Sequence, residues 1–126
     1  MGIPDVITVS DEIQKKIKLL ERMRKEVLER GQHKAEAIAE YEKCLTIDIV
    51  KLKNMQKGET IDFEGIQIKA PLPITIIEKI AKGMCYKEKL SMEQADASYK
   101  SVITNINTVQ AELSALQSLN RFLDKA

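Results

Sequence analysis

The sequence predicts a mainly α-helical protein, in which two long antiparallel helices form a coiled-coil-like αα-hairpin with a small β-hairpin and a short helix inserted between them. Aromatic residues make up only 4% of the 126 residues and Trp is absent, which suits a core of Leu, Ile, Val and Ala between helices. Such a length makes one domain. The strongest signal is a seam with alternating steps of four and three residues, a period of 3.5 that is typical of packed helices; it runs through Ala95, Tyr99, Val102, Ile106, Val109, Leu113, Leu116, Asn120 and Leu123.

The first long helix is predicted over residues 10–57, after an extended lead-in over residues 1–9. Ser10 is a favourable N-cap residue, and the carboxylates of Asp11 and Glu12 suit the positive end of the helix dipole. Apolar residues continue at helical spacing beyond this start. We therefore expect the lead-in to cover an edge of the core and the helix to begin at Ser10.

Two glycines, Gly31 and Gly58, bear on the course and the end of this first helix. Gly31 is its weak point, because glycine costs about 1 kcal/mol relative to alanine inside a helix. It indicates a bend or the close approach of another chain. Gly58 is expected to cap the C-terminal end. An unbroken helix would be on the order of 70 Å long and would need a partner along its whole length.

The hydrophobic period changes to two over residues 59–70, which predicts a β-hairpin. Its two alternating runs flank Glu64-Gly65, a two-residue connector with a glycine where a tight turn needs one. A lone hairpin is marginal in water. Its apolar face is therefore expected to rest on the helices or to pair with another chain.

A short helix is predicted over residues 75–83, followed by the second long helix over residues 86–124. Thr75 and Glu78 have the spacing of a capping box. The chain either continues helically after the short helix or begins again at Ser91.

A pair of helices leaves one face of each partly exposed, so we expect a homo-oligomer, a dimer or an assembly of dimers. Asn120 in the apolar seam supports this expectation, because a buried Asn fixes register and stoichiometry. The alternative is that Asn120 lies at a frayed and hydrated helix end.

Charge is balanced overall but concentrated locally. The net charge is +1, which gives no strong field toward nucleic acid or anionic lipid. Eight basic and three acidic residues nevertheless give residues 14–34 a local charge of +5. This basic strip, from Lys15 to Lys34, is either a solvated helix face with ion pairs such as Glu21–Lys25 and Glu26–Arg30, or a contact for phosphate backbones.

Cys44 and Cys85 are far apart in the sequence and lack the spacing of a metal or redox motif, so reduced thiols in an intracellular protein are expected. The first ten residues do not have the pattern of a signal peptide. No run approaches the roughly 18 apolar residues of a membrane span. We expect no membrane partner.

Catalysis has little support in the sequence. His33 is the only histidine, and neither a glycine-rich phosphate loop nor a Cys/His cluster is present. We expect a protein that is not an enzyme and that has no cofactor, no catalytic residue and no metal ligand.

The best binding candidate is an anion site at the start of the short helix. The helix start at Thr75 presents backbone N–H groups that suit a phosphate, and Lys69, Lys79 and Lys82 add positive charge. Arg121 could join them from a second subunit of an antiparallel dimer. The alternative is that Thr75 only caps its helix and that the lysines are solvated.

Two segments of the sequence are distinctive, IAKG (residues 80–83) and LQSLNRFL (residues 116–123). Together with residues 39–43, 49–53, 73–79, 99–100 and 113–115, they make the chain from Lys34 onward resemble small helical early-gene proteins from phages and prophages of Gram-positive bacteria. The resemblance implies a phage-derived protein that acts in the host cytoplasm. Small phage proteins of this build include oligomeric inhibitors of host immunity, among them the Thoeris anti-defence sponges, which sequester nucleotide signals; none of their binding residues can be placed on this chain.

These observations lead to three hypotheses. The first is an oligomeric anti-defence protein that holds a cyclic or otherwise phosphorylated nucleotide without turning it over. The second is a nucleic-acid-binding accessory of phage replication or recombination that uses the basic strip. The third is a coiled-coil inhibitor or adaptor that binds a host defence protein through its helices.

Overall fold

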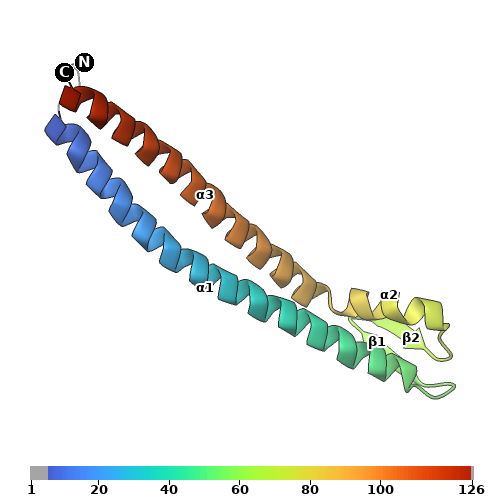
Figure 1. Cartoon of the computed structure of the whole chain (residues 1–126). Helices are drawn as coiled ribbons and strands as arrows, with labels where there is room; N and C mark the ends of the chain where they lie inside the picture. Colours follow the sequence, from blue (N-terminus) through green and yellow to red (C-terminus); the bar gives the residue numbers. More distant parts are fainter. Residues whose placement is uncertain (1–5, 126) are drawn as a thin grey trace. The chain divides into compact units, whose positions relative to one another are not determined.

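The structure, a computed structural model, describes residues 6–125 and confirms a mainly helical protein with a small β-hairpin between two long helices (Figure 1). The elements in order are α1 (Val6–Lys53), β1 (Thr60–Phe63), β2 (Ile66–Lys69), α2 (Ile74–Met84) and α3 (Tyr86–Lys125). They belong to two compact units. The helix-pair unit comprises α1 up to Gln32 and α3 from Asp96, and the hairpin unit comprises His33–Ala95.

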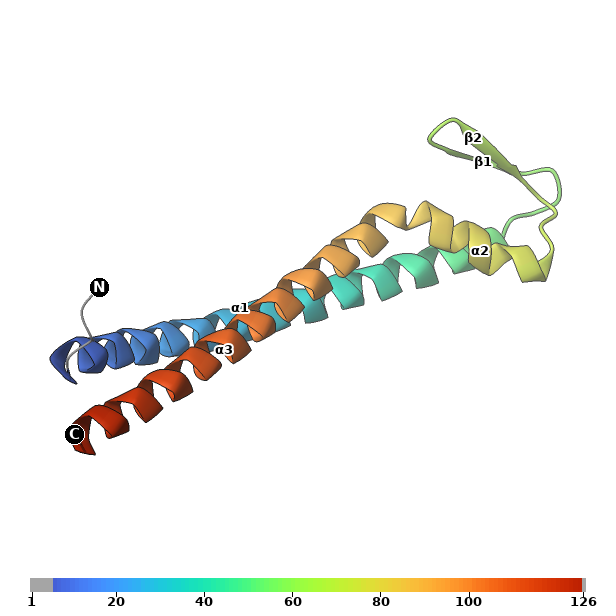
Figure 2. The same cartoon turned by 90° about the horizontal axis from the view of Figure 1, so that it is seen from above.

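In the helix-pair unit, α1 and α3 lie side by side and antiparallel (Figures 1 and 2). Lys16 forms an ion pair with Glu112, and Arg30 donates a hydrogen bond to Ser98. Residue numbers therefore increase along α1 as they decrease along α3, as expected for antiparallel helices. The predicted seam is confirmed, because its members within this unit are buried or half-buried. The most enclosed apolar side chains of the unit are Val9, Leu20, Val102 and Val109.

Gly31 lies inside an unbroken α1 and faces α3. A methyl group built on Gly31 would lie 3.5 Å from Cε2 of the Tyr99 ring. The expected close approach is therefore made by Tyr99 of the same chain, and the predicted alternative, a partner chain at this glycine, is not needed to explain it.

We expect Gly31→Ala to stabilise the protein by about 1 kcal/mol, because alanine has the higher helix propensity and its methyl group would make an ordinary contact with Tyr99. Urea unfolding followed by circular dichroism measures the change. Gly58→Ala is the contrasting variant: a methyl group at Gly58 would meet no atom within 4 Å, but the φ of +90° there strains any L side chain, so that variant should lose stability. A loss of stability in Gly31→Ala would show instead that the Tyr99 ring leaves no room for a methyl group at this position.

The predicted extended lead-in is wrong for residues 6–9, which form the first turns of α1. Val9 is buried in the helix-pair unit, and burial overrides the modest helix propensity of its β-branched side chain. Ser10 is therefore a residue inside the helix and does not cap it. Residues 1–5 of the predicted lead-in lie outside the described residues.

The other end of α1 also differs from the prediction. The helix ends at Lys53, before the predicted end at residue 57. Gly58 does not cap the helix; its N–H instead bonds to the carbonyl of Ala70 at 3.4 Å, and the N–H of Ala70 bonds to the carbonyl of Glu59 at 2.9 Å. Gly58 thus helps to close the open end of the β-hairpin.

The predicted hairpin is confirmed. Strands β1 and β2 pair antiparallel with Ile61 opposite Ile68, and the connector Glu64-Gly65 has positive φ at both residues, 49° and 87°. Two consecutive positive φ angles are the signature of a type I′ turn, which matches the twist of paired strands.

The hairpin rests on helices of its own chain, as one of the two predicted arrangements requires. Its Ile68 is buried together with Leu52 of α1 and with Ile77 and Ala81 of α2. Around them pack half-buried apolar residues: Leu45, Ile49, Met55, Ile61, Phe63, Leu72, Ile80 and Met84. These contacts form the core of the hairpin unit.

The predicted capping box of α2 is wrong. Pro73 occupies the N-cap position and provides no side-chain hydrogen bond, so Thr75 is already a helical residue. Proline is tolerated at the start of a helix because the first N–H groups have no intrahelical acceptors, so the N–H that proline lacks breaks no helical hydrogen bond. The helix α3 begins at Tyr86, the predicted first residue of the second long helix, and no second start occurs at Ser91.

Over residues 6–125, no helix is both long enough and apolar enough to span a bilayer.

Candidate functional site

The hairpin unit contains an apolar pocket of about 410 Å³ between the hairpin and α2. A volume of this size lies in the range of small-molecule sites. Apolar side chains make up most of the wall, and Gln67 and Lys69 supply its polar groups. The lining residues are Phe63, Ile66, Gln67, Ile68, Lys69, Leu72, Ile80, Gly83 and Met84.

Contacts between the hairpin and the start of α3 hold the Phe63 wall of the pocket. The rings of Phe63 and Tyr86 meet edge to face, with centroids 6.3 Å apart. The Tyr86 hydroxyl donates to the Glu64 carboxylate at 2.9 Å, and this bond raises the pKa of Tyr86. Lys87 adds an ion pair to Glu64 at 3.7 Å. The turn of the hairpin is thus attached to α3.

The structure places the predicted anion-site residues in different settings. Lys69 lines the apolar pocket, whereas Lys82 forms an exposed ion pair with Glu78 at 3.2 Å. Thr75 and Lys79 are exposed on α2. Arg121 is exposed in the helix-pair unit and is not part of the pocket lining. The predicted contribution of Arg121 from a second subunit stays a prediction.

Part of the basic strip forms ion pairs. Lys15 contacts Glu12 at 3.3 Å, Lys16 contacts Glu112, and the predicted pair Glu26–Arg30 is confirmed at 3.4 Å. Four further basic residues are exposed on the surface of α1, namely Lys18, Arg22, Arg24 and Lys25. Nucleic-acid binding by this strip stays a prediction.

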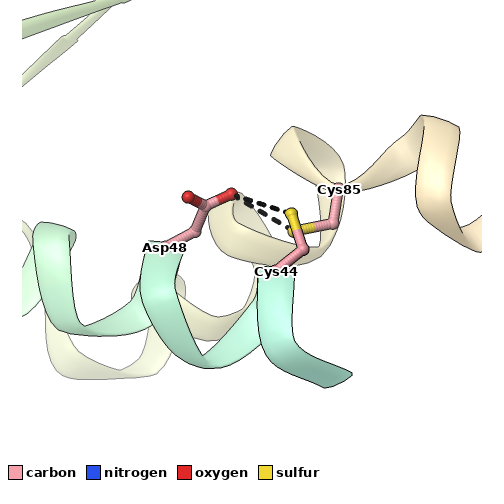
Figure 3. A group of neighbouring side chains, drawn as sticks. All are labelled: Cys44, Asp48 and Cys85. Atoms are coloured by element: carbon pink, nitrogen blue, oxygen red, sulfur yellow. Dashed lines mark hydrogen bonds between the residues drawn. The ribbon is translucent and has the colours of Figure 1, made fainter. Parts of the chain in front are cut away.

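The hairpin unit also brings together three side chains that the sequence analysis did not connect, Cys44, Asp48 and Cys85 (Figure 3). Cys44 and Asp48 lie one turn apart on α1, and Cys85 lies between α2 and α3. The two sulfurs are 2.6 Å apart, and Asp48 Oδ2 lies 3.2 Å from Cys85 Sγ and 3.6 Å from Cys44 Sγ. Both cysteines are free thiols, as predicted, but they are neighbours in space.

Two of the three side chains of this thiol–carboxylate cluster are buried, and Cys44 is half-buried. Cys85 is fully buried, and Asp48 is only 9% exposed. Burial raises the pKa of the Cys85 thiol, and the neighbouring Cys44 and Asp48 raise it further. Burial also raises the pKa of Cys44, with smaller contributions from Asp48 and Glu88. Both thiols are therefore protonated at neutral pH in the absence of a bound cation.

One signal in the sequence could have found this cluster. Asp48 stands four residues after Cys44 and four residues before Leu52, which places a carboxylate on the apolar face of α1. A charged side chain at a core position of a helix is rarely buried without a partner. The position of Asp48 on the apolar face of α1 could therefore have predicted a partner for its carboxylate.

No protein-family model, curated protein or solved structure matches the chain.

Proposed function

We propose that this chain is a non-enzymatic binding protein that holds a phosphorylated nucleotide in the pocket between the hairpin and α2. The observation that carries the proposal is the apolar pocket with Lys69 on its wall. Sites for small organic ligands combine mostly apolar walls with a few polar groups that fix orientation. The pocket has this composition.

The two parts of a nucleotide suit the two kinds of surface in the pocket. The apolar walls, which include the aromatic ring of Phe63, suit a nucleobase, because flat rings bury well against aromatic and aliphatic side chains. The ammonium group of Lys69 suits a phosphate oxygen, because charge-assisted hydrogen bonds are the stronger ones. Lys79 and Lys82 on α2 supply further positive charge to this unit.

The biological role that fits this binding activity is the inhibition of host immunity by a phage-derived protein. The resemblance to small phage early-gene proteins supports it, and sequestration of a nucleotide signal in the host cytoplasm needs binding without turnover. In this proposal the chain acts as a homo-oligomer, and Arg121 of a second copy completes the anion site.

The first experiment identifies the ligand. Purified protein is incubated with an extract of cells in which nucleotide-based defence signalling is active, washed and heat-denatured, and the released small molecules are analysed by mass spectrometry. A released phosphorylated nucleotide is the expected result. Release of no nucleotide, when a known nucleotide-binding control protein releases its own ligand, would contradict the proposal.

The second experiment locates the site by titration calorimetry with the released nucleotide. We expect Lys69→Ala to weaken binding by roughly ten- to a hundredfold, since a hydrogen bond to a charged group contributes about 1.5–3 kcal/mol. Gly83→Phe should also weaken binding, because Gly83 lines the pocket and a phenyl group there would fill it. Gly83→Ala is the matched control, since a methyl group at this position meets no atom within 4 Å. Equal affinities for all four proteins would place the ligand elsewhere.

A further inference from the structure

We propose that Cys44, Asp48 and Cys85 form a binding site for a divalent transition-metal ion, Zn²⁺, within the hairpin unit. Their ligand atoms lie within 4.8 Å of one another, close enough to share one ion. The site is separate from the apolar pocket, because none of the three residues lines that pocket.

The burial of Asp48 is the first argument for a cation. A buried carboxylate is costly unless it is paired or coordinates a metal. The partners that the structure gives Asp48 are two thiols, and S–H groups are weak donors. An ion bound at this point would supply the positive charge that the thiols do not.

The geometry is the second argument. Zn–S bonds of about 2.3 Å and Zn–O bonds of about 2.0–2.2 Å in a tetrahedron place sulfur and oxygen about 3.5 Å apart. The two observed distances from Asp48 Oδ2 to the sulfurs are 3.2 and 3.6 Å. The same tetrahedron places its sulfurs about 3.8 Å apart, so the thiols of Cys44 and Cys85, now 2.6 Å apart, must separate by about 1 Å. Side-chain rotation of Cys44, which is only half-buried, can provide this movement.

The surroundings of the cluster provide access and a fourth ligand. A pocket of about 370 Å³ opens beside Cys44 and Asp48, so an ion can enter from solvent. Its wall includes Glu88, one turn along the chain from Cys85. The charged groups around it are the carboxylates of Glu40 and Glu88 and the ammonium group of Lys43. Glu88 or a water molecule would complete four-coordination.

The ligand chemistry selects Zn²⁺ among the common ions. Two thiolates exclude Mg²⁺ and Ca²⁺, which prefer oxygen ligands, and a carboxylate disfavours Cu(I), which prefers sulfur alone. Binding exchanges two protons for one metal ion: each S–H bond breaks, each sulfur forms a bond to Zn²⁺, and both protons pass to solvent. The sulfurs are neither oxidised nor reduced, so the step needs no oxidant.

A disulfide between Cys44 and Cys85 is the competing use of these residues. The sulfurs lie 2.6 Å apart, so the two cysteines are close enough to pair, although both are free cysteines in the structure. The buried carboxylate of Asp48 lies beside both sulfurs and favours a bound cation over a neutral disulfide at this point.

Cobalt titration of the full-length, reduced and chelator-stripped protein tests the proposal. Co²⁺ replaces Zn²⁺ in thiolate sites and gives thiolate-to-cobalt charge-transfer absorption together with the visible bands of tetrahedral coordination. We expect both, with one ion per chain, and we expect added Zn²⁺ to abolish them. Elemental analysis of protein purified from zinc-supplemented cells should then find one zinc per chain. Protein that gives no such absorption and carries no zinc would overturn the proposal.

Two variants assign ligands, and a third serves as their control. Cys85→Ser should abolish the charge-transfer absorption, and Asp48→Asn, which preserves side-chain volume, should weaken Co²⁺ binding by more than about tenfold, since even outer-shell partners of a metal cost ten- to a hundredfold. Glu40→Gln is the matched control, because Glu40 lies on the same pocket wall but outside the cluster. Circular dichroism verifies that each variant is folded.

Two outcomes of these measurements would overturn the site even if metal binds. Equal Co²⁺ affinity in Asp48→Asn, Cys85→Ser and the unchanged protein would mean that surface groups hold the ion. An intact mass two hydrogens lower than that of the reduced chain, with no titratable thiol in the protein as purified without reductant, would show that a disulfide occupies the position.

Discussion

Leu52→Ala should destabilise the hairpin unit by about 2–5 kcal/mol, the range for removing a buried leucine side chain from a well-packed core. Leu52 is 2% exposed and lies in the core cluster with Ile68, Ile77 and Ala81. Because α1, β2 and α2 all contribute to this cluster, the cavity left by the shorter side chain would border all three elements. Urea unfolding followed by circular dichroism measures the loss, which is a large part of the total stability of a domain of this size.

Val50→Ala on the same helix is the matched control. Val50 is 50% exposed, and exposed substitutions away from special features usually change stability by no more than about 0.5 kcal/mol. The comparison isolates burial from helix propensity, since both variants place alanine in the last two turns of α1. Similar small losses in both variants would contradict the assignment of Leu52 to the core.

The periodicity of the sequence predicted most of this fold, because each repeating pattern of apolar residues shows which face of one helix or strand is buried. The 3.5-residue seam required α3 to bury one stripe, and Val102 and Val109 are buried as it predicted. The alternation around Glu64-Gly65 predicted the hairpin and its turn. Each pattern lies within a single segment, so both can be recognised without knowing how the rest of the chain folds.

The errors at the starts of α1 and α2 have two physical causes. Ser10 and Thr75 are favourable cap residues, but neither caps its helix. The burial of Val9 extends α1 beyond Ser10 toward its N-terminus. Pro73 takes the N-cap position of α2, so the helix begins at Ile74, one residue before Thr75. Tertiary packing and proline geometry decided these boundaries. Neither is visible in the spacing of a cap residue and its partner.

The thiol–carboxylate cluster was missed for a different reason. Cys44 and Asp48 are separated from Cys85 by the hairpin and α2, so their meeting depends on how those two elements fold back onto α1. No spacing rule covers such a connection, whereas Lys69 could be proposed from its position before the short helix. The pair Cys44 and Asp48 on α1 could nevertheless have been predicted from the sequence, because Asp48 occupies a core position of the helix.

Asn120→Leu should stabilise the helix-pair unit by about 1–3 kcal/mol. The side-chain oxygen Oδ1 of Asn120 is buried and has no hydrogen-bond partner among the described residues, and an unsatisfied buried acceptor costs about this much. Asn120 occupies a seam position between Leu116 and Leu123, so leucine restores the apolar pattern without changing the register. Urea unfolding measures the gain in stability.

Gln117→Leu is the matched control for Asn120→Leu, because Gln117 lies on the exposed side of the same helix and its replacement should change stability by no more than about 0.5 kcal/mol. The two variants also test the predicted homo-oligomer by light scattering after gel filtration. A single polar residue at a seam position fixes the number of helices that associate, at a cost in stability. If a second copy satisfies Asn120 in solution, Asn120→Leu will change the oligomeric state while Gln117→Leu will not, and that result would contradict an orphaned oxygen within one chain.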